Sequence, residues 1–324
     1  MLSRRGMMAG AAALSAGTAG LGALGGCTRE VKAVAGFIGR MTAIQQRLGG
    51  RLGVCALTGN GDHTASGSLS IQSTERFAHC STFKWLLATR ILQMADQGQV
   101  TLDKAIAYGK ADLLDYAPVT KANVAKGRMT LTELCAAAVT LSDNTAANLL
   151  LAQVGGPAGL TQFARGLGDA ETRFDRTEPD LNSNQANDPR DTTTPAAMAG
   201  LLRTVYTGTV LKPDSLAQLK AWMVGCQTGL KEIRAGVPAG WTVADKTGRG
   251  NGAVNDVAVV WPPKNDKIDK AGKEQAPVFL AIYTTGGTLG DDDRNQIIAD
   301  TARLVFDSIG FVESLGQSTS SSAE

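Results

Sequence analysis

The stretch CSTFKWLLATRILQ, Cys80 to Gln93, predicts the start of an amphipathic helix. Apolar residues at helical spacing make its core-facing stripe: Phe83, Leu86, Leu87 and Ile91. Ser81 stands in the first turn and Lys84 follows three residues later, so the two side chains share one face. Because a hydroxyl is a weak nucleophile that needs an adjacent base, the pair is a candidate for nucleophilic catalysis. The alternative is a serine N-cap followed by a solvated lysine.

Two further polar motifs lie at predicted element boundaries. The motif Ser-Asp-Asn at 142–144 separates two predicted helices, where all three residue types would also serve as an N-cap. The motif Lys-Thr-Gly at 246–248 ends a strand predicted to begin at Trp241, and would otherwise be a strand running into a glycine-rich turn. Each motif alone is ambiguous. Chance rarely places these three motifs in this order at a helix start, a helix junction and a strand end.

Hydrophobic periodicity predicts strands at both ends of the chain and helices between them. Residues 51–71 read as a hairpin around the turn GNGD, residues 81–206 are mostly helical, and three strands follow Gly236 before a last helix. Residues 171–194 have no period, which predicts a long functional loop. The sequence therefore predicts an α+β fold, an α/β sandwich of an antiparallel sheet with helices plus an all-α domain, with the site in a cleft between them.

The expected domain boundaries follow from this pattern. Residues 1–26 are an export signal, residues 27–78 and 223–315 form the α/β domain, and residues 79–222 form the all-α domain. The all-α domain includes an omega-type loop at 173–194. Residues 316–324 are small and polar, which predicts a disordered tail.

The first residues have the pattern of an export signal. Arg4 and Arg5 precede a small, apolar and uncharged run, which resembles a twin-arginine signal. The sequence LGGC, Leu24 to Cys27, resembles a lipoprotein cleavage box and makes Cys27 a candidate for lipidation. The alternative is ordinary cleavage near Gly26. We expect an exported, periplasmic protein whose membrane attachment would depend on a lipid at Cys27.

Composition excludes several classes of function. The chain has 324 residues, 43% of them hydrophobic, which is enough for a sizeable core, and its net charge of +2 argues against a nucleic-acid partner. The two histidines, His63 and His79, are too few for a zinc site built on several histidines. No metal and no cofactor are expected, and we expect a monomer. Four further cysteines leave either disulfides or buried free thiols open: Cys55, Cys80, Cys135 and Cys226.

The three motifs together resemble those of class A serine β-lactamases, and the likeness extends over roughly residues 31–310. The stretch RTEPDLN, Arg176 to Asn182, extends the resemblance, because a glutamate and an asparagine at this spacing position a hydrolytic water in that family. This implies that role for Glu178 and Asn182. The resemblance also implies the fold shared by β-lactamases and penicillin-binding transpeptidases. Two residues would, by the same likeness, form a salt bridge that closes the loop: Arg176 and Asp191.

The resemblance implies hydrolysis of the β-lactam amide of penicillins and cephalosporins, and with it antibiotic resistance. Ser81 would form an acyl-enzyme, and its proton would leave to Lys84 or, through a water, to Glu178. Ser142 would relay a proton to the lactam nitrogen, and water activated by Glu178 would release the product. The backbone N–H groups of Ser81 and Arg249 would form the oxyanion hole. The implied substrate-binding residues are Tyr116, Asn144, Asn182, Lys246, Thr247, Gly248 and Arg249.

The sequence departs from the family where many relatives carry an arginine for the substrate carboxylate. Other residues stand at those places: Glu232, Val254 or Asn255, and Asn295. We hypothesise that Arg249 supplies the missing charge, and a solvated arginine at a strand edge is the alternative. Cys80 resembles half of a disulfide of carbapenem-hydrolysing members. Because Gly250 occupies the place of its partner, no carbapenemase activity is inferred.

Two rival functions remain. A penicillin-binding DD-peptidase or penicillin sensor shares the Ser-Lys chemistry but lacks an efficient deacylation apparatus, which Glu178 and Asn182 would provide. A catalytically silent lipoprotein would use the fold for binding, but it would have no chemical reason to keep Ser81, Lys84 and Lys246. Sustained turnover separates the enzyme from both rivals.

Overall fold

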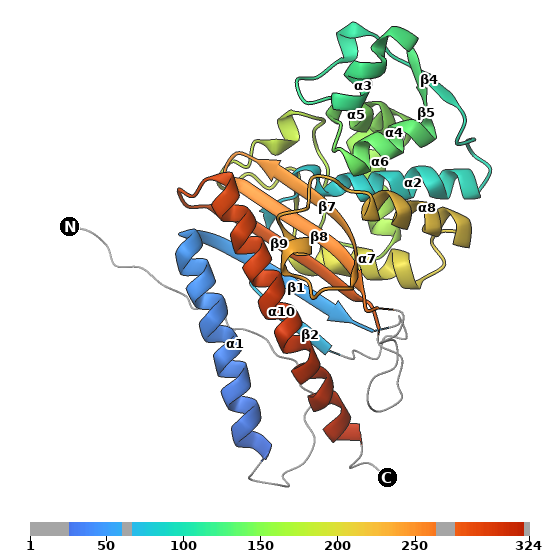
Figure 1. Ribbon diagram of the computed structural model, residues 1–324. Coiled ribbons are helices and arrows are strands. Elements are labelled where there is room, and N and C mark those ends of the chain that lie inside the picture. Colours follow the sequence, from blue (N-terminus) through green and yellow to red (C-terminus); the bar gives the residue numbers. More distant parts are fainter. Residues whose placement is uncertain (1–25, 60–66, 264–275, 321–324) are drawn as a thin grey trace.

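The computed structural model of the protein describes residues 26–59, 67–263 and 276–320 (Figure 1). The predicted export signal, apart from Gly26, and most of the GNGD turn lie outside the described residues. Cys27, the candidate for lipidation, lies in the first turn of the first helix. Within the described ranges, no helix is both long enough and apolar enough to span a membrane.

A five-stranded antiparallel sheet joins the two ends of the chain, as the periodicity predicts. Its strands lie in the order β2-β1-β9-β8-β7, with these bounds: β1 Gly50–Thr58, β2 Gly67–Ile71, β7 Thr242–Gly250, β8 Ala253–Trp261 and β9 Val278–Gly286. Strand β1 pairs with β2 on one side and with β9 on the other, where Val54 opposes Ile282. Strand β7, which carries the Lys-Thr-Gly motif, is left at the edge of the sheet.

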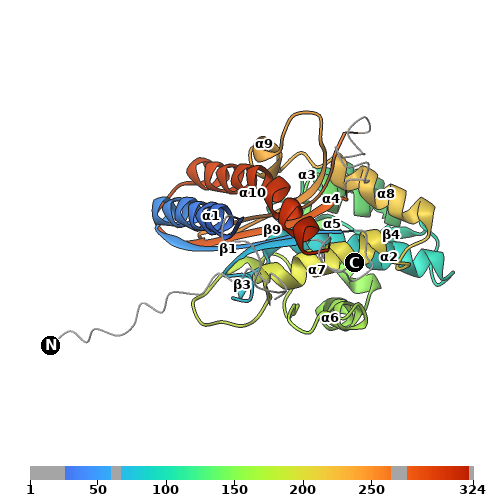
Figure 2. The same cartoon turned by 90° about the horizontal axis from the view of Figure 1, so that it is seen from below.

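Alternate residues of the central strands pack into two different cores. Val54 and Ile282 belong to the core shared with α1 (Gly26–Leu48) and α10 (Asp291–Ser320). Phe279 and Tyr283 of β9 instead pack in the same core as Phe77. Figure 2 shows α1 and α10 side by side on one face of the sheet and α7 (Pro195–Thr207) on the other. Because both faces are covered, the central strands are apolar on both sides.

The last helix is longer than the sequence pattern predicts. Helix α10 continues to Ser320 and so includes the first five residues of the predicted tail, 316–320. Each residue added to an existing helix gains a backbone hydrogen bond, so a helix can extend beyond the part that packs on a core. Residues 321–324 lie outside the described residues.

Further helices lie beside the sheet as a second part (Figure 1): α2 Lys84–Asp96, α3 Pro118–Asn123, α4 Leu131–Thr140, α5 Asn144–Gln153, α6 Gly156–Gly166 and α8 Pro213–Val224. Helix α2 lies at the centre and contacts α4, α5, α6 and α8. Trp85, Ala88 and Thr89 lie off the predicted apolar stripe, yet they are fully buried. The prediction of a helix with one apolar face is therefore wrong, because neighbours cover α2 nearly all round.

Two pairs of short strands and one short helix complete the fold. Strand β3 (Phe77–Ala78) pairs with β6 (Thr192–Thr193), and β4 (Ala105–Ala107) pairs with β5 (Arg128–Thr130). The short helix α9 spans Ile233–Gly236. Helix α7 falls inside the span predicted as all-α, but it packs against β1 and β9 of the sheet. The division of the chain at residues 79 and 222 stays a prediction.

The four cysteines of the described core are free. All four are buried: Cys55, Cys80, Cys135 and Cys226. Of the two alternatives left open by the sequence, the structure has the buried free thiols.

Candidate active site

Ser81 lies in a tight turn that leads into the central helix. The turn is a 3₁₀ helix, Cys80–Phe83, and α2 begins only at Lys84, so the predicted α-helical start lies three residues too early. Residues three apart eclipse each other in a 3₁₀ helix, so Ser81 and Lys84 still share one face. Cys80 has a φ of +46°, a left-handed conformation that is uncommon outside glycine. Thr82 fixes the turn, because its hydroxyl donates to the carbonyl of His79 at 2.7 Å.

Three side chains meet at the serine. The Ser81 hydroxyl donates to Oε1 of Glu178 at 3.0 Å, and Nζ of Lys84 lies 2.9 Å from the same oxygen. Asn182 donates from its Nδ2 to the other carboxylate oxygen, Oε2, at 2.5 Å. The long loop and the central helix thus bring a nucleophile, a cation and a carboxylate within hydrogen-bond reach of one another.

Burial and ion pairing shift the pKa values of this group. Lys84 is fully buried, and burial lowers the pKa of its ammonium although the charge of Glu178 opposes this. Burial raises the pKa of Glu178, but the charge and hydrogen bond of Lys84 and the hydrogen bonds from Asn182 and Ser81 outweigh it. The pKa of Glu178 is therefore below its ordinary value. A carboxylate held in its charged form can accept a proton from a hydroxyl or a water.

The residues of the motif at 142–144 have two roles, since one caps a helix and the other two face the site. Asp143 is the N-cap of α5 and accepts from the backbone N–H of Ala146 at 2.9 Å. Ser142, with a φ of +58°, and Asn144 are therefore free to face the lysines. Lys84 donates to the Ser142 carbonyl at 2.8 Å and to Oδ1 of Asn144 at 2.6 Å. The N-cap alternative holds for Asp143 alone.

Strand β7 closes the site from the opposite side. Nζ of Lys246 donates to the Ser142 hydroxyl at 3.0 Å, which joins the second motif to the third. Burial lowers the pKa of Lys246 to about 8, and the charge of Lys84 acts in the same direction. The hydroxyls of Thr247 and Thr228 lie 2.5 Å apart.

Gly248 allows this strand to pass directly against the turn that carries the serine. A Cβ atom at position 248 would lie 2.8 Å from the carbonyl oxygen of His79 and 2.9 Å from the backbone nitrogen of Thr82. Real Cβ atoms do not approach backbone this closely, so only glycine fits without a shift. Gly248 thus sets the distance between β7 and the turn of Ser81.

Asn148 was missed by the sequence analysis. It lies one turn after Asn144 on α5, and its side chain clamps the loop: Oδ1 accepts from the backbone N–H of Glu178 at 2.9 Å and Nδ2 donates to the Glu178 carbonyl at 2.9 Å. The four-residue spacing from Asn144 was the signal that could have found it. Asn148 holds the backbone of the residue that carries the carboxylate.

The ends of the loop are joined by an ion pair. Nε of Arg176 lies 2.6 Å from Oδ2 of Asp191. The other oxygen of Asp191 accepts from the backbone N–H groups of Asp175 and Arg176 at 2.8 and 2.9 Å. Asp191 is almost fully buried, so these bonds hold the loop in a poorly solvated position.

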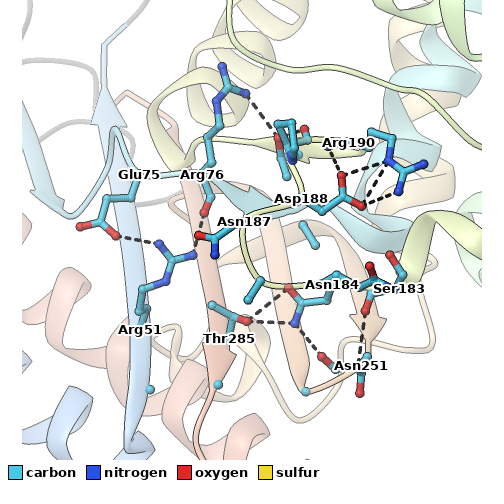
Figure 3. A pocket seen from close by; sticks show the side chains of 18 of the residues that line it. Arg51, Glu75, Arg76, Ser183, Asn184, Asn187, Asp188, Arg190, Asn251 and Thr285 are labelled. Carbon is cyan, nitrogen blue, oxygen red and sulfur yellow. Dashed lines mark hydrogen bonds and ion pairs between the residues drawn. The ribbon is translucent and has the colours of Figure 1, made fainter.

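A cavity of about 850 Å³ lies on the other side of this loop, against the ends of the sheet strands (Figure 3). Asn184 lines it, and its Nδ2 donates to the Asn251 carbonyl at 2.6 Å and to the Thr285 hydroxyl at 2.9 Å. Arg51 and Arg190 in its wall pair with acidic neighbours. Ser81 does not line this cavity, whose hydrogen bonds tie the loop to the sheet.

Arg249 and Tyr116 are partly exposed residues beside the third and second motifs. The Arg249 guanidinium pairs with the buried Glu232 and donates to Oδ1 of Asn295 at 2.6 Å, so it is not simply solvated. Tyr116 is 50% exposed, and its carbonyl accepts from the backbone N–H of Asn144 at 3.0 Å. Burial raises the pKa of Tyr116, and the nearby charge of Arg249 opposes that shift. In the sequence Glu232 stands out only as a departure from the family pattern, and no local signal indicates a role for it.

His79 is not placed as a base for the serine. Its ring is buried between Phe83 and Phe174, with centroids 5.5 and 4.8 Å away, and its Nδ1 lies 2.8 Å from the Cys80 carbonyl. His63 lies outside the described residues. Across the described part of the chain, no group of three or more His, Cys, Asp or Glu side chains is arranged to hold a metal ion.

Comparison with known proteins identifies relatives over most of the chain. Residues 40–309 match the model of the "Beta-lactamase enzyme family". The chain is 40% identical over 269 residues to β-lactamase CTX-M-8 of Citrobacter amalonaticus, which covers 83% of this chain and 87% of that protein. It is 43% identical over 273 residues to β-lactamase AST-1 of Nocardia asteroides, covering 84% of this chain and 83% of that protein.

Solved structures lead to the same group. A class A β-lactamase described as the last common ancestor of Gram-negative bacteria superposes with a TM-score of 0.77 at 49% sequence identity. The match covers 84% of this chain and 98% of that one.

Proposed function

The chain belongs to the class A β-lactamases, and from this premise we propose that it hydrolyses the β-lactam amide of penicillins and cephalosporins through an acyl-enzyme on Ser81. The observation that carries the proposal is the meeting of Ser81 and Lys84 at one oxygen of Glu178. Such a group supplies a nucleophile, a base and a tuning charge at one point. Antibiotic resistance would be the consequence for the cell.

Acylation begins with attack of the Ser81 oxygen on the lactam carbonyl. The hydroxyl proton moves to Glu178, which already accepts its hydrogen bond, or to a neutral Lys84, whose pKa burial lowers. The backbone N–H groups of Ser81 and Arg249 stabilise the oxyanion. Ser142, bridged to both lysines, carries a proton to the departing lactam nitrogen.

Substrate binding uses the walls of the cleft. Lys246 and Thr247 bind the substrate carboxylate beside Gly248, and Arg249 adds positive charge there. Asn144 hydrogen-bonds the amide of the substrate side chain. Tyr116, which is half-exposed, packs against the substrate.

Deacylation depends on the long loop. Glu178 takes a proton from the attacking water, and Asn182 holds both the carboxylate and that water. General-base catalysis of this kind contributes about 10²–10⁴-fold. Asn148 and the pair of Arg176 with Asp191 keep the loop in place for this step.

We also propose that the protein is exported to the periplasm and acts there as a monomer. The paired Arg4 and Arg5 support twin-arginine export, and the LGGC sequence supports lipidation of Cys27. Mass spectrometry of the mature N-terminus tests the lipid: a mass without acyl groups would refute it.

The experiment for the enzymatic proposal is hydrolysis of a chromogenic cephalosporin by the protein from Cys27 onward, beside Glu178→Gln, followed past one equivalent. We expect continuous turnover by the wild type, and one burst followed by a stall in the variant. A single burst in both proteins would indicate a penicillin-binding protein or sensor. No burst in either would withdraw the function.

A further inference from the structure

Arg249 binds a carboxyl group that no step above uses. Glu232 is fully buried, and one of its oxygens, Oε1, binds the Arg249 guanidinium. Its other oxygen, Oε2, is buried and has no hydrogen-bond partner among the residues that the structure describes. A buried carboxylate with an unpartnered oxygen is costly in its charged form, so this group is poised between its charged and neutral states.

We propose that Glu232 is a positioning residue that sets the charge which Arg249 presents to the substrate carboxylate, so that substrate affinity changes with the protonation of Glu232. This inference rests on the proposed function. Ionised Glu232 neutralises Arg249 and competes with the incoming carboxylate for its guanidinium. Protonated Glu232 leaves the positive charge of Arg249 available beside Lys246 and Thr247.

The charges around Glu232 come from several elements. On β7, Asp245 raises its pKa, while Arg249 and Lys246 lower it. Asp256 on β8 is a buried carboxyl whose own pKa is raised well above the usual value by burial, with Asp245 and Glu232 adding to the effect. Arg234 at α9 lies 2.5 Å from Asp245 and is engaged there.

The remaining neighbour is the start of α10. Oδ2 of Asp291 lies 3.5 Å from Nη1 of Arg249, but this carboxylate is largely exposed and is screened by water. Burial is the largest influence on Glu232 and raises its pKa to about 7. Glu232 therefore changes charge across neutral pH, where the enzyme would act.

The experiment measures KM and kcat separately, from about pH 5.5 to about pH 9, for a chromogenic cephalosporin with a free carboxylate and for its methyl ester. For the acid, the wild-type KM should rise about two- to tenfold as pH increases through about 7. The ester has no carboxylate to bind Arg249, so its KM should not change across this range. The pH dependence of kcat should not follow this step.

Two variants locate the cause. In Glu232→Gln the step near neutral pH should disappear, and KM should stay at its low-pH value until Lys246 loses its proton. In Arg249→Ala the step should also disappear, but KM should stay at its high value. Glu75→Gln is the matched control. Glu75 lies away from the site, and its Oε2 is 2.9 Å from Nη1 of Arg51. This variant should keep the wild-type pH profile of KM.

A step near neutral pH that persists in Glu232→Gln would overturn the inference, as would an equal step for the ester. If the wild type hydrolyses neither compound, the proposed function fails instead. Calorimetric binding of the free acid to the wild type and to Glu232→Gln then decides the inference: loss of the pH-dependent affinity in the variant supports it, and an unchanged dependence overturns it.

Discussion

Nζ of Lys84 lies 2.9 Å from Oε1 of Glu178, and both side chains are completely buried. Removing one partner of a buried ion pair leaves an uncompensated charge, which typically destabilises a protein by about 3–5 kcal/mol. We predict that Lys84→Met lowers the free energy of unfolding by this amount. It should also abolish hydrolysis, because the pKa of Glu178 rises once the cation is gone. Urea denaturation and the cephalosporin assay measure the two effects.

The double variant Lys84→Met with Glu178→Gln is the control for this prediction. It has no buried charge at the pair, so it should recover part of the lost stability while remaining inactive. A double variant less stable than Lys84→Met would show that the two side chains do not compensate each other.

The N-cap of α5 also anchors the neighbouring segment. The buried Asp143 carboxylate accepts from the backbone N–H of Ala146 and from the backbone and hydroxyl of Thr120. We predict that Asp143→Ala lowers the free energy of unfolding by about 2–4 kcal/mol, measured by thermal or urea denaturation. Asp143→Asn keeps an acceptor for the cap and should lose less. Equal stability of Asp143→Ala and the wild type would contradict this role.

The contact of β7 with the turn that carries Ser81 can be tested at Gly248. We predict that Gly248→Ala lowers kcat/KM at least about tenfold and destabilises the protein by about 1–3 kcal/mol, because the new Cβ forces the strand away from Thr82. Steady-state kinetics and thermal denaturation measure both. Gly200→Ala in α7 is the control: apart from the local helix backbone, no atom of the described residues lies within 4 Å of its Cβ position, and alanine favours a helix. If both substitutions have the same small effect, the close approach at Gly248 is unimportant.

Deprotonation of Lys246 should set the alkaline limb of the pH profile of KM, which is the range where KM rises as pH increases. Burial lowers the pKa of its ammonium to about 8, so the cation is present below that pH and is lost as pH rises through it. We predict that KM for a carboxylate-bearing β-lactam increases above pH 8, with a smaller change in kcat. Lys246→Arg stays charged and should shift this limb beyond the measurable range. An alkaline limb unchanged in Lys246→Arg would assign it to another group.

The sequence alone determined the kinds of element and the chemistry-bearing motifs. Strand and helix periods, turn residues and N-caps are local signals, so the hairpin of β1 and β2, the final helix and the cap before α5 could be predicted from short stretches. The motif at Ser81 and Lys84, and Glu178 in the long loop, could be found because each pattern lies within a few residues of chain.

Other features were decided only by tertiary structure. The predicted apolar stripe of α2 was wrong because helices far along the chain cover its other faces. No local pattern shows that Asn148 clamps the backbone of Glu178, or that Glu232 is buried beneath Arg249. Burial, ion pairing and the pKa shifts that follow depend on which distant segments meet, and that is decided by the packing of the whole chain rather than by any one stretch of it.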